Sequence, residues 1–480
     1  MSEAHQEDYR AAAATLQKFW QSHVLRFWGN LNNASRKKLL AQIQSIDFDF
    51  MARLAMKYIK TTAKEATVGE LKPAPVITLA QQYQSPNEVA ERRKEGEKFM
   101  RTGKLAALLV AGGQGSRLGF EGPKGSLPIG PVSNKPLFQL HAEKLLASAR
   151  RHGSEIPWYI MTSETNDAET KDFFEIHNYF ELQKQNVFFF KQGELPALDN
   201  EGKLILDAPD HIFMNPDGHG GTLRALQKSG ALKNMQQRGI EEIFYFQVDN
   251  VLLNMCDPLF IGYHLHAEAE MSAKVCAKRD ASEKMGLLGM IDDRVTVIEY
   301  SDMRTEDKQA LLPDGTLKYK YGNLAIHLFK RSFIEREVGD GKSDKTSGKL
   351  PWHLAHKRIS YVDASGNLIN PSQPNGYKFE TFIFDALGDA RRVVCMEVDR
   401  RDEFSGVKNA EGEDSPATAK AAMIDVYSQW LEAAGILVPR AADGKVLCRI
   451  EINPLYALDA AELAAKVPAD LQIGDMLYLE

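Results

Sequence analysis

The chain has 480 residues, enough for two or three domains, and its 44% hydrophobic and 26% charged residues are typical of a globular protein. A net charge of -6 argues against a general binder of nucleic acid or of anionic membranes, because such proteins carry a basic face. No apolar run reaches the ~20 residues of a membrane span, and we expect no signal peptide. The four cysteines form neither a disulfide framework nor a zinc motif, so we expect reduced thiols, a cytoplasmic location and oxygen ligands for any metal.

The first part of the sequence, residues 1–95, is predicted to be helical. Apolar residues recur at helical spacing between Tyr9 and Trp28, and the stretch from Leu39 to Phe48 repeats the pattern. We expect these helices to brace the core of the protein, in preference to a regulatory or oligomer-forming role. Prolines between residues 73 and 86 indicate a linker before the next segment.

Residues 96–395 alternate between predicted strands and helices. The strands are expected at 105–110, 158–162, 187–191 and 243–248, and the helices at 137–151, 166–174 and 222–228. Gly153 is expected to end the first of these helices, and Asn166 with Glu169 is expected to begin the second as a capping box. The alternation predicts an α/β fold with a mostly parallel, doubly wound (Rossmann-like) central sheet that carries helices on both faces.

The rest of the chain contains shorter elements. Strand-like runs over 295–300 and 324–329 predict a small subdomain inserted against the main sheet. A helix over 417–435 and a strand over 446–452 predict a small C-terminal lobe. The predicted division is therefore an N-terminal helical segment at 1–95, a central domain at 96–395 and a C-terminal lobe at 396–480.

The most informative motif follows the first predicted strand. It reads Ala111-Gly112-Gly113-Gln114-Gly115-Ser116-Arg117-Leu118-Gly119 and continues with Gly122-Pro123-Lys124-Gly125. Glycine allows backbone N–H groups to approach a ligand closely, and Arg117 and Lys124 supply positive charge for phosphates. The motif is not a Walker A loop, because Lys124 follows a proline, and it is not a dinucleotide fingerprint, because the next helix begins only near residue 137. It predicts a nucleotide whose phosphates lie across the loop, and it argues against a dehydrogenase.

Two further polar side chains directly follow predicted strands. Gln192 comes after the strand at 187–191, and Asp249 comes after the strand at 243–248. Ligands of parallel sheets bind outside the carboxyl ends of the strands, so we expect these side chains and the glycine motif to converge on one crevice. Mg²⁺ takes one or two carboxylates together with phosphate oxygens and water, which makes Asp249 the candidate metal ligand. Asp217 and Glu299 remain open as a second carboxylate ligand.

The glycine motif and the segments after it resemble a known family. Ala-Gly-Gly-x-Gly-[ST]-Arg-Leu-Gly followed by Pro-Lys-Gly is similar to the signature of sugar nucleotidyltransferases, and its extended form resembles the uridylyltransferases that include the eukaryotic UDP-N-acetylglucosamine pyrophosphorylases. Matching segments continue in order to about residue 410, at 157–163, 192–197, 216–221, 247–250, 297–301, 322–323, 374–380 and 404–410. The resemblance implies a GT-A-like nucleotidyltransferase sheet and a Mg²⁺-dependent transfer of uridylyl from UTP to a sugar 1-phosphate, with release of pyrophosphate.

The resemblance also implies roles for individual residues. The expected catalytic residues are Arg117 and Lys124 at the triphosphate, Lys408 at the sugar 1-phosphate, and Asp249 at the metal. The expected nucleotide-binding residues are Ala111, Gly112, Gly113, Gln114, Gly115 and Lys124, with Gln192 and Gly218 at the uracil. The expected residues at the sugar phosphate are His219, Gly286, Glu299, Asn323, Lys378 and Lys408.

The identity of the sugar stays open at this point. N-acetylglucosamine 1-phosphate is the leading expectation, but the resembling N-acetylhexosamine enzymes have Asn where this chain has His219. Formation of UDP-glucose or of a broad range of UDP-sugars is the alternative within the enzyme class, and a catalytically silent sensor of UDP-sugars is the alternative outside it. The expected partners are UTP and a sugar 1-phosphate, with neither nucleic acid nor membrane. The composition does not determine the oligomeric state, and it is compatible with a monomer.

Overall fold

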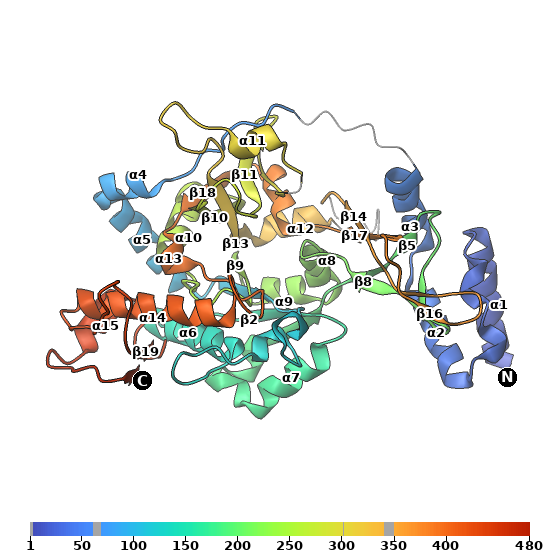
Figure 1. The fold of residues 1–480 in the computed structure, drawn as a ribbon, viewed down its shortest axis with the longest axis horizontal. Helices are drawn as coiled ribbons and strands as arrows, with labels where there is room; N and C mark the ends of the chain where they lie inside the picture. Colours follow the sequence, from blue (N-terminus) through green and yellow to red (C-terminus); the bar gives the residue numbers. More distant parts are fainter. Residues whose placement is uncertain (1–2, 61–68, 301, 340–349) are drawn as a thin grey trace. The chain divides into compact units, whose positions relative to one another are not determined.

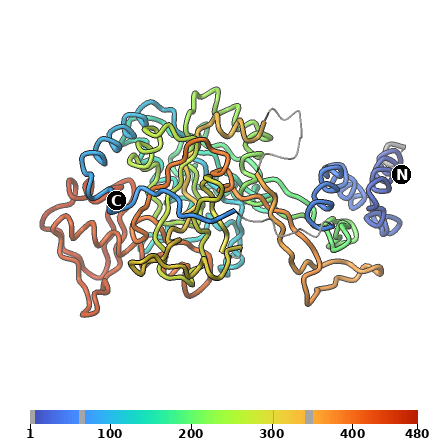
Figure 2. Tube along the Cα trace, turned by 90° about the horizontal axis from the view of Figure 1, so that it is seen from above, coloured from blue at the N-terminus to red at the C-terminus, as the bar shows by residue number. Residues whose placement is uncertain are grey.

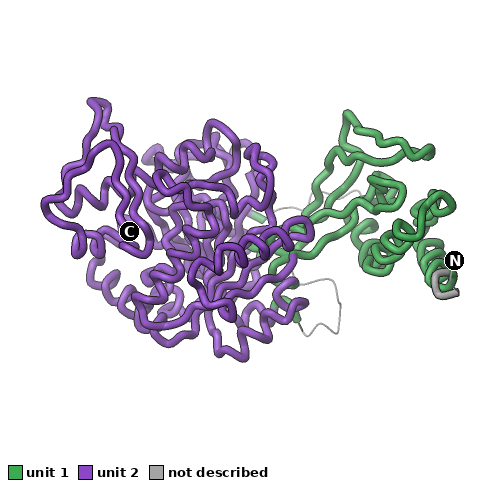
Figure 3. The backbone as a smooth tube through the Cα atoms, turned by 90° about the horizontal axis from the view of Figure 1, so that it is seen from below, with its two compact units in different colours: residues 1–69, 192–224, 337–385 green, residues 70–191, 225–336, 386–480 purple. Residues whose placement is uncertain are grey.

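The computed structural model describes residues 3–60, 69–300, 302–339 and 350–480, and Figure 1 shows their helices and strands. The chain forms two compact units (Figure 3). Unit 1 comprises residues 1–69, 192–224 and 337–385, and unit 2 comprises residues 70–191, 225–336 and 386–480. Each unit has its own hydrophobic core. The division of the sequence into 1–95, 96–395 and 396–480 stays a prediction.

Unit 2 is built on a nine-stranded sheet whose first half is entirely parallel. In this parallel half, the order of adjacent strands across the sheet is β9 (Glu242–Gln247), β1 (Leu105–Val110), β2 (Trp158–Thr162) and β3 (Val187–Lys191). The strands predicted at 105–110, 158–162 and 187–191 are confirmed with their bounds, and the strand predicted at 243–248 lies one residue earlier. β1 and β2 are continuous apolar runs because strands inside a parallel sheet are covered on both faces.

The second half of the sheet is mixed. β13 (Tyr321–Lys330) pairs antiparallel with β9, with β10 (Met271–Ala277) and with β11 (Leu287–Ile291), which forms a hairpin with β12 (Arg294–Ile298). β18 (Val393–Glu397) then pairs in parallel with β10. The runs over 295–300 and 324–329, which were expected to form a small subdomain inserted against the main sheet, are instead hydrogen-bonded into the central sheet itself. Local pattern identified β12 and β13, but neither β10, β11 and β18 nor the pairing of these strands.

Helices alternate with the strands along unit 2, as the sequence predicted (Figure 1). They are α4 (Leu79–Gln84), α5 (Pro86–Met100), α6 (Leu137–His152), α7 (Asp167–Ile176), α9 (Ala231–Gln237), α10 (Pro258–His266), α11 (Thr305–Gln309), α13 (Arg400–Glu403), α14 (Pro416–Ala433) and α15 (Ala460–Lys466), while α8 (Gly221–Lys228) and α12 (Arg331–Val338) contain points where the chain passes between units. β19 (Arg449–Ile452) and β20 (Met476–Leu479) form a small parallel pair near the C-terminus. Gly153 ends α6 in the left-handed conformation, as predicted.

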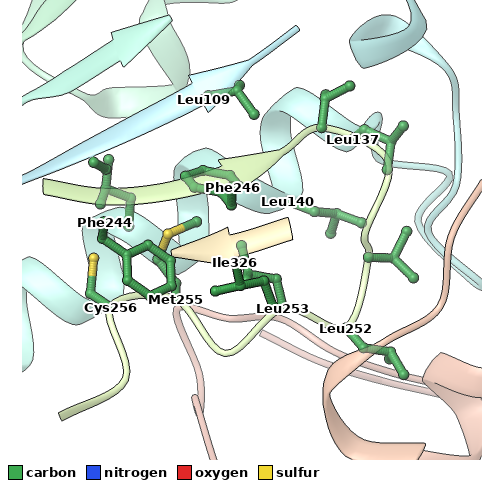
Figure 4. Packing of buried hydrophobic residues seen from close by; sticks show 14 of the residues in the cluster. Leu109, Leu137, Leu140, Phe244, Phe246, Leu252, Leu253, Met255, Cys256 and Ile326 are labelled. Carbon is green, nitrogen blue, oxygen red and sulfur yellow. The ribbon is translucent and has the colours of Figure 1, made fainter. Parts of the chain in front are cut away.

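The core of unit 2 joins the sheet to the loop that follows β9. Phe244 and Phe246 of β9 and Leu109 of β1 are fully buried, and side chains of α6 and of residues 252–256 pack in the same cluster (Figure 4). Each fully buried side chain of this size contributes about 1.5–3 kcal/mol of hydrophobic free energy. The loop after β9 is therefore held down by packing as well as by hydrogen bonds.

Unit 1 combines three segments of the chain that are distant in sequence. Segments 192–224 and 350–385 lie side by side (Figure 2), where β5 (Leu198–Asp199), β17 (Gly376–Glu380) and β14 (His353–Lys357) form a sheet in the order β14-β17-β5. The other strands are the hairpins β4 (Glu194–Pro196) with β8 (Met214–Pro216), β6 (Leu206–Ala208) with β7 (His211–Ile212), and β15 (Tyr361–Val362) with β16 (Leu368–Ile369).

The N-terminal helices supply much of the core of unit 1. They are α1 (Glu3–Lys18), α2 (Asn33–Ser45) and α3 (Phe48–Leu54), which continues into a π-helical turn over Ala55–Lys60. Their buried side chains pack with those of 198–212, Trp352 and Phe379. The helical pattern expected between Tyr9 and Trp28 is interrupted, because the chain leaves α1 after Lys18 and Trp20 adopts a left-handed φ of 61°. Residues 61–68 of the predicted helical segment lie outside the described residues. No helix in the described ranges has the length and apolarity that crossing a membrane requires.

Candidate active site

The sheet of unit 2 has a point at which the strand order reverses. From β1 the chain adds β2 and β3 on one side, and β9 then returns to the other side of β1. Val110 at the end of β1 is paired with Gln247 at the end of β9, so the loops that follow both strands begin at the same edge of the sheet. Such reversal points are where α/β sheets bind their ligands. The glycine motif and Asp249 both lie there.

The glycine motif folds back on itself as a closed loop. The Lys124 N–H donates to the Gly113 carbonyl at 3.0 Å, and the Gly115 N–H donates to the Gly122 carbonyl at 2.9 Å. A Cβ at Gly115 would lie 2.7 Å from the ring of Phe120, which explains glycine at that position. Among the described residues, no acceptor is bonded to the backbone N–H groups of 112–114. Successive free amides of this kind bind anions and other acceptor groups.

Lys124 and Asp249 are brought together as the sequence predicted. The Lys124 Nζ lies 3.5 Å from Asp249 Oδ2, and their side chains are 19% and 13% exposed, so both remain accessible. Arg117 is exposed in the 3₁₀ turn Ser116–Leu118. The edge of the sheet therefore presents free amide donors, an ammonium group and a carboxylate within one short stretch of surface.

A distant segment completes this region of unit 2. The Val407 N–H donates to the Asp249 carbonyl at 3.0 Å, and the Ser405 N–H donates to Asn250 Oδ1 at 3.0 Å. Lys408 directly follows Val407 in the sequence and is exposed. Its Nζ lies 5.6 Å from the centre of the Phe404 ring. The structure thus places the backbone of the predicted sugar-phosphate lysine next to the predicted metal ligand.

Two polar residues of α6 hold the Asp249 turn from inside the protein. His141 Nε2 is 3.0 Å from the Val248 carbonyl, and Lys144 Nζ donates to the carbonyls of Val251 and Leu253 at 2.6 and 3.0 Å. Burial, assisted by the charge of Lys144, lowers the pKa of His141 to about 3, so its imidazole is neutral and donates this bond. Burial also lowers the pKa of Lys144 to about 8. Sequence reasoning missed both residues, although a histidine and a lysine at i and i+3 on the apolar face of a helix are a detectable signal.

Asn166 is a third residue whose contacts the sequence did not reveal. It precedes α7 as predicted, but its side chain makes no capping bond, so the predicted capping box is wrong. The side chain instead reaches the glycine loop, where Nδ2 donates to the carbonyls of Ala111 and Gly113 at 2.9 and 3.3 Å. Local pattern could not distinguish a helix cap from a contact with a loop more than fifty residues earlier.

Three of the predicted sugar-binding residues come together in unit 2. The Asn323 N–H donates to the Gly286 carbonyl at 2.9 Å. A Cβ built on Gly286 would lie 2.9 Å from Val297 Cγ1 and 3.4 Å from Glu299 Oε1, so the absence of a side chain lets β12 and the Glu299 carboxylate pack close to this backbone. Asn323 Oδ1 accepts a bond from the Ala325 N–H at 3.3 Å. Ser301, the last residue of the matching segment 297–301, lies outside the described residues.

The two predicted uracil residues contact each other in unit 1. Gln192 Nε2 donates to the Gly218 carbonyl at 2.7 Å. Gly218 has a φ of 82°, and a Cβ there would lie 2.3 Å from the Thr381 carbonyl oxygen, so both conformation and space require glycine. Beside them the buried Asp217 pairs with Arg224 at 2.9 Å, and burial raises the pKa of this carboxyl despite the arginine. Asp217 is therefore engaged in a structural ion pair.

His219 and Lys378 also belong to unit 1. His219 Nδ1 accepts the Ile383 N–H at 3.1 Å, and its ring stacks on Phe382 with centroids 5.4 Å apart. Burial, assisted by His353, lowers the pKa of His219 to about 4, so the imidazole is neutral and carries its proton on Nε2. Lys378 Nζ lies 4.9 Å from the centre of the Phe213 ring. The convergence of Gln192 with the glycine loop and Asp249 on one crevice stays a prediction.

Asp249 fits a magnesium ion that a nucleotide helps to hold. Within the described ranges, no three side chains of His, Cys, Asp or Glu gather into a ready-made metal site. Mg²⁺ does not need one, because it is commonly bound by one or two carboxylates together with substrate phosphates and water. A single accessible carboxylate at the sheet edge, next to free amide donors, has the chemistry of such a site.

A glycine loop and an accessible aspartate at the reversal point of a largely parallel sheet define a nucleotide-binding α/β protein of the nucleotidyltransferase type, and the predicted fold class is confirmed. Residues 48–433 match the family described as UTP--glucose-1-phosphate uridylyltransferase, and the chain belongs to this family.

Its relatives include proteins with known structures and names. The chain is 36% identical over 446 residues to the human UDP-N-acetylhexosamine pyrophosphorylase-like protein 1, covering 90% of this chain and 86% of the relative. It is 36% identical over 453 residues to the UDP-N-acetylglucosamine pyrophosphorylase of Saccharomyces cerevisiae, covering 91% and 93%. The crystal structure of the uridine diphosphate N-acetylglucosamine pyrophosphorylase from Trypanosoma brucei, in complex with inhibitor, is similar with a TM-score of 0.80 and 26% identity, covering 98% of each chain.

Proposed function

We propose that the protein is a uridylyltransferase that makes a UDP-sugar and pyrophosphate from UTP and a sugar 1-phosphate, with N-acetylglucosamine 1-phosphate as the acceptor. The observation that carries this proposal is the group of free amides at 112–114 beside the Lys124–Asp249 pair, at the reversal point of the sheet. Membership of the uridylyltransferase family supports the reaction. The names of the relatives support the choice of sugar.

The reaction joins two molecules of like charge. A phosphate oxygen of the sugar 1-phosphate forms a bond to the α-phosphorus of UTP, while the bond from that phosphorus to the pyrophosphate oxygen breaks in line. The barrier is mainly electrostatic and positional, so the protein needs cations and rigid donors in place of a nucleophile of its own. Lys124 and Arg117 are proposed to bind the triphosphate, and Lys408 is proposed to bind the sugar phosphate.

Mg²⁺ is the proposed cofactor, held by Asp249 together with phosphate oxygens. When bound, it supplies positive charge that offsets the charge of the phosphates. His141 and Lys144 contribute by fixing the turn that carries Asp249, since they bond to carbonyls on both sides of it. Lys124 lies close enough to Asp249 to orient its carboxylate.

The proposed recognition of uracil and sugar follows from hydrogen bonds that are already made. Gln192 uses its amide N–H on Gly218, so its Oε1 is the atom to accept the imide N–H of uracil. His219 is neutral with its proton on Nε2, so it is proposed to donate a hydrogen bond to a sugar oxygen and not to supply charge. Glu299 is proposed to accept hydroxyl groups of the sugar, next to Gly286 and Asn323.

The test is pyrophosphate release across a panel of nucleoside triphosphates and sugar 1-phosphates. We expect release with UTP and N-acetylglucosamine 1-phosphate in the presence of Mg²⁺, and little with the other nucleotides. An Asp249→Ala variant that releases pyrophosphate at the rate of the unmodified protein would remove the metal assignment. A preference of about tenfold for glucose 1-phosphate, or 1.4 kcal/mol in the barrier, would replace the proposed sugar by glucose. UDP-sugar binding without any pyrophosphate release would identify a sensor.

A cytoplasmic location is proposed as well. Its support is that Cys256, Cys276, Cys395 and Cys448 are all buried free thiols, as expected in a reducing compartment. UTP and the sugar 1-phosphate are the proposed partners, without nucleic acid or membrane.

A further inference from the structure

The side chain of Asn166 is completely buried and uses its amide group at both ends. Its Oδ1 accepts the Ser163 N–H at 2.8 Å, just beyond the end of β2. Its Nδ2 donates to the carbonyls of Ala111 at 2.9 Å and of Gly113 at 3.3 Å. Asn166 therefore ties the loop after β2 to the loop after β1.

These bonds determine which way the peptide groups of the glycine loop face. In a trans peptide the carbonyl and the following N–H point in opposite directions. Because the carbonyls of Ala111 and Gly113 are directed at Asn166, the N–H groups of Gly112 and Gln114 are directed away from it. These two are among the amides that donate to no acceptor within the described part of the chain.

We propose that Asn166 is a positioning residue for nucleotide binding, which holds the Gly112 and Gln114 amides in the direction from which they donate to acceptor groups of UTP. This inference rests on the proposed function for the identity of the ligand. An amide side chain suits the task because one planar group supplies the acceptor for Ser163 and the donors for both carbonyls. Without it the Ala111 carbonyl loses its hydrogen-bond donor and the Gly113 carbonyl keeps only the Lys124 N–H, so the orientation of both peptides is less restrained.

A role as an ordinary helix cap does not account for these contacts. The Asn166 side chain makes no bond to a free N–H at the start of α7. Thr170, one turn later in α7, provides a matched control, because it is also completely buried and the structure assigns its hydroxyl no hydrogen-bond partner. A cavity made at Thr170 tests whether loosening this helix is sufficient for any effect.

The experiment compares Asn166→Ala, Asn166→Asp and Thr170→Ala in the full chain by two measurements. The first is hydrogen exchange without nucleotide at the Gly115 and Lys124 amides, whose bonds close the glycine loop. We expect exchange to become about tenfold faster or more in Asn166→Ala and to stay unchanged in Thr170→Ala. Asn166→Asp keeps the side-chain shape and the acceptor for Ser163 but directs an oxygen at two carbonyls, so it is expected to loosen the loop as well.

The second measurement is steady-state pyrophosphate release. We expect both Asn166 variants to raise the KM for UTP by about tenfold or more while changing the KM for the sugar 1-phosphate much less, and Thr170→Ala to change neither. An unchanged KM for UTP in the Asn166 variants would overturn the inference, as would an equal increase in Thr170→Ala. If the unmodified protein released no pyrophosphate, the proposed function would fail; faster exchange in Asn166→Ala would then still support the positioning of the loop, and unchanged exchange would overturn it.

Discussion

A buried ion triad links the sheet of unit 2 to the segment that leads to Lys408. Lys274 on β10 is completely buried, with its Nζ 2.8 Å from Asp257 Oδ2 and 2.7 Å from Glu403 Oε1. Asp257 also caps α10, and the Glu403 carbonyl accepts a bond from Asn250 at 2.8 Å. Burial raises the pKa of Glu403 even beside Lys274. At Asp257 burial acts in the same direction, but the charge and hydrogen bond of Lys274, together with Arg93 and the Leu259 N–H, more than offset it and lower the pKa.

Replacing Lys274 by Met leaves two buried carboxylates without their cation. Breaking a buried pair in this way costs about 3–5 kcal/mol of unfolding free energy, which is a large share of the 5–15 kcal/mol that stabilises a typical domain. In the variant both carboxyl pKa values are raised in the folded state. The penalty is therefore absent below the unfolded pKa of about 4 and grows as pH rises through the folded values. We expect the loss to be largest at neutral pH and to shrink toward pH 5.

Urea unfolding followed by circular dichroism measures this loss at several pH values. Lys278→Met is the matched control, because Lys278 is also largely buried but its Nζ donates to the Ala281 carbonyl at 3.2 Å and makes no buried triad. Adding Glu403→Gln to Lys274→Met removes one of the stranded charges and should recover part of the stability. The reasoning is refuted if Lys274→Met is no less stable than Lys278→Met at neutral pH, or if acidification does not reduce the difference.

Three shorter predictions concern the loops and the sugar side. Gly113→Ala should fold normally, since the nearest atom to the new Cβ is Lys124 Cε at 3.8 Å, yet it should weaken UTP binding by about tenfold or more, measured by calorimetry, because the methyl group occupies the space of the ligand. Gly125→Ala should lower the unfolding free energy by about 1–3 kcal/mol, because its Cβ would lie 2.2 Å from the Phe138 ring; an unchanged urea midpoint would contradict this. His219 has a pKa of about 4 and is neutral from about pH 6 to 8, so the ratio of sugar 1-phosphate KM values between His219→Asn and the unmodified protein should be constant over that range. A ratio that rises on acidification would show that a charged imidazole takes part.

Local sequence was sufficient for the elements whose environment is uniform along the chain. β1 and β2 were predicted with their bounds, because a strand buried in a parallel sheet must be apolar at nearly every position, and the partly buried edge strand β3 was predicted with its bounds as well. The glycine loop was recognisable because closely spaced glycines allow backbone conformations, and a close approach of the backbone to a ligand, that other residues do not. Asp249 and Lys124 could be expected near each other, since both follow strands of one sheet, and the structure places them 3.5 Å apart.

Tertiary structure decided which partners the ambiguous residues take. Asn166 carries the local signal of a helix cap, but its amide bonds to the glycine loop, which is too distant in the sequence for local pattern to reveal the contact. The apolar pattern from Tyr9 to Trp28 suits a helix, yet α1 ends at Lys18 because the following residues pack into the core of unit 1 in another conformation. Gly286, Glu299 and Asn323 meet only because β11, β12 and β13 pair in one sheet. Residue type and spacing determine which kinds of hydrogen bond and packing contact a segment can make. Hydrogen bonds between distant segments form only when the whole chain has folded. These bonds then decide which of several possible partners each residue contacts.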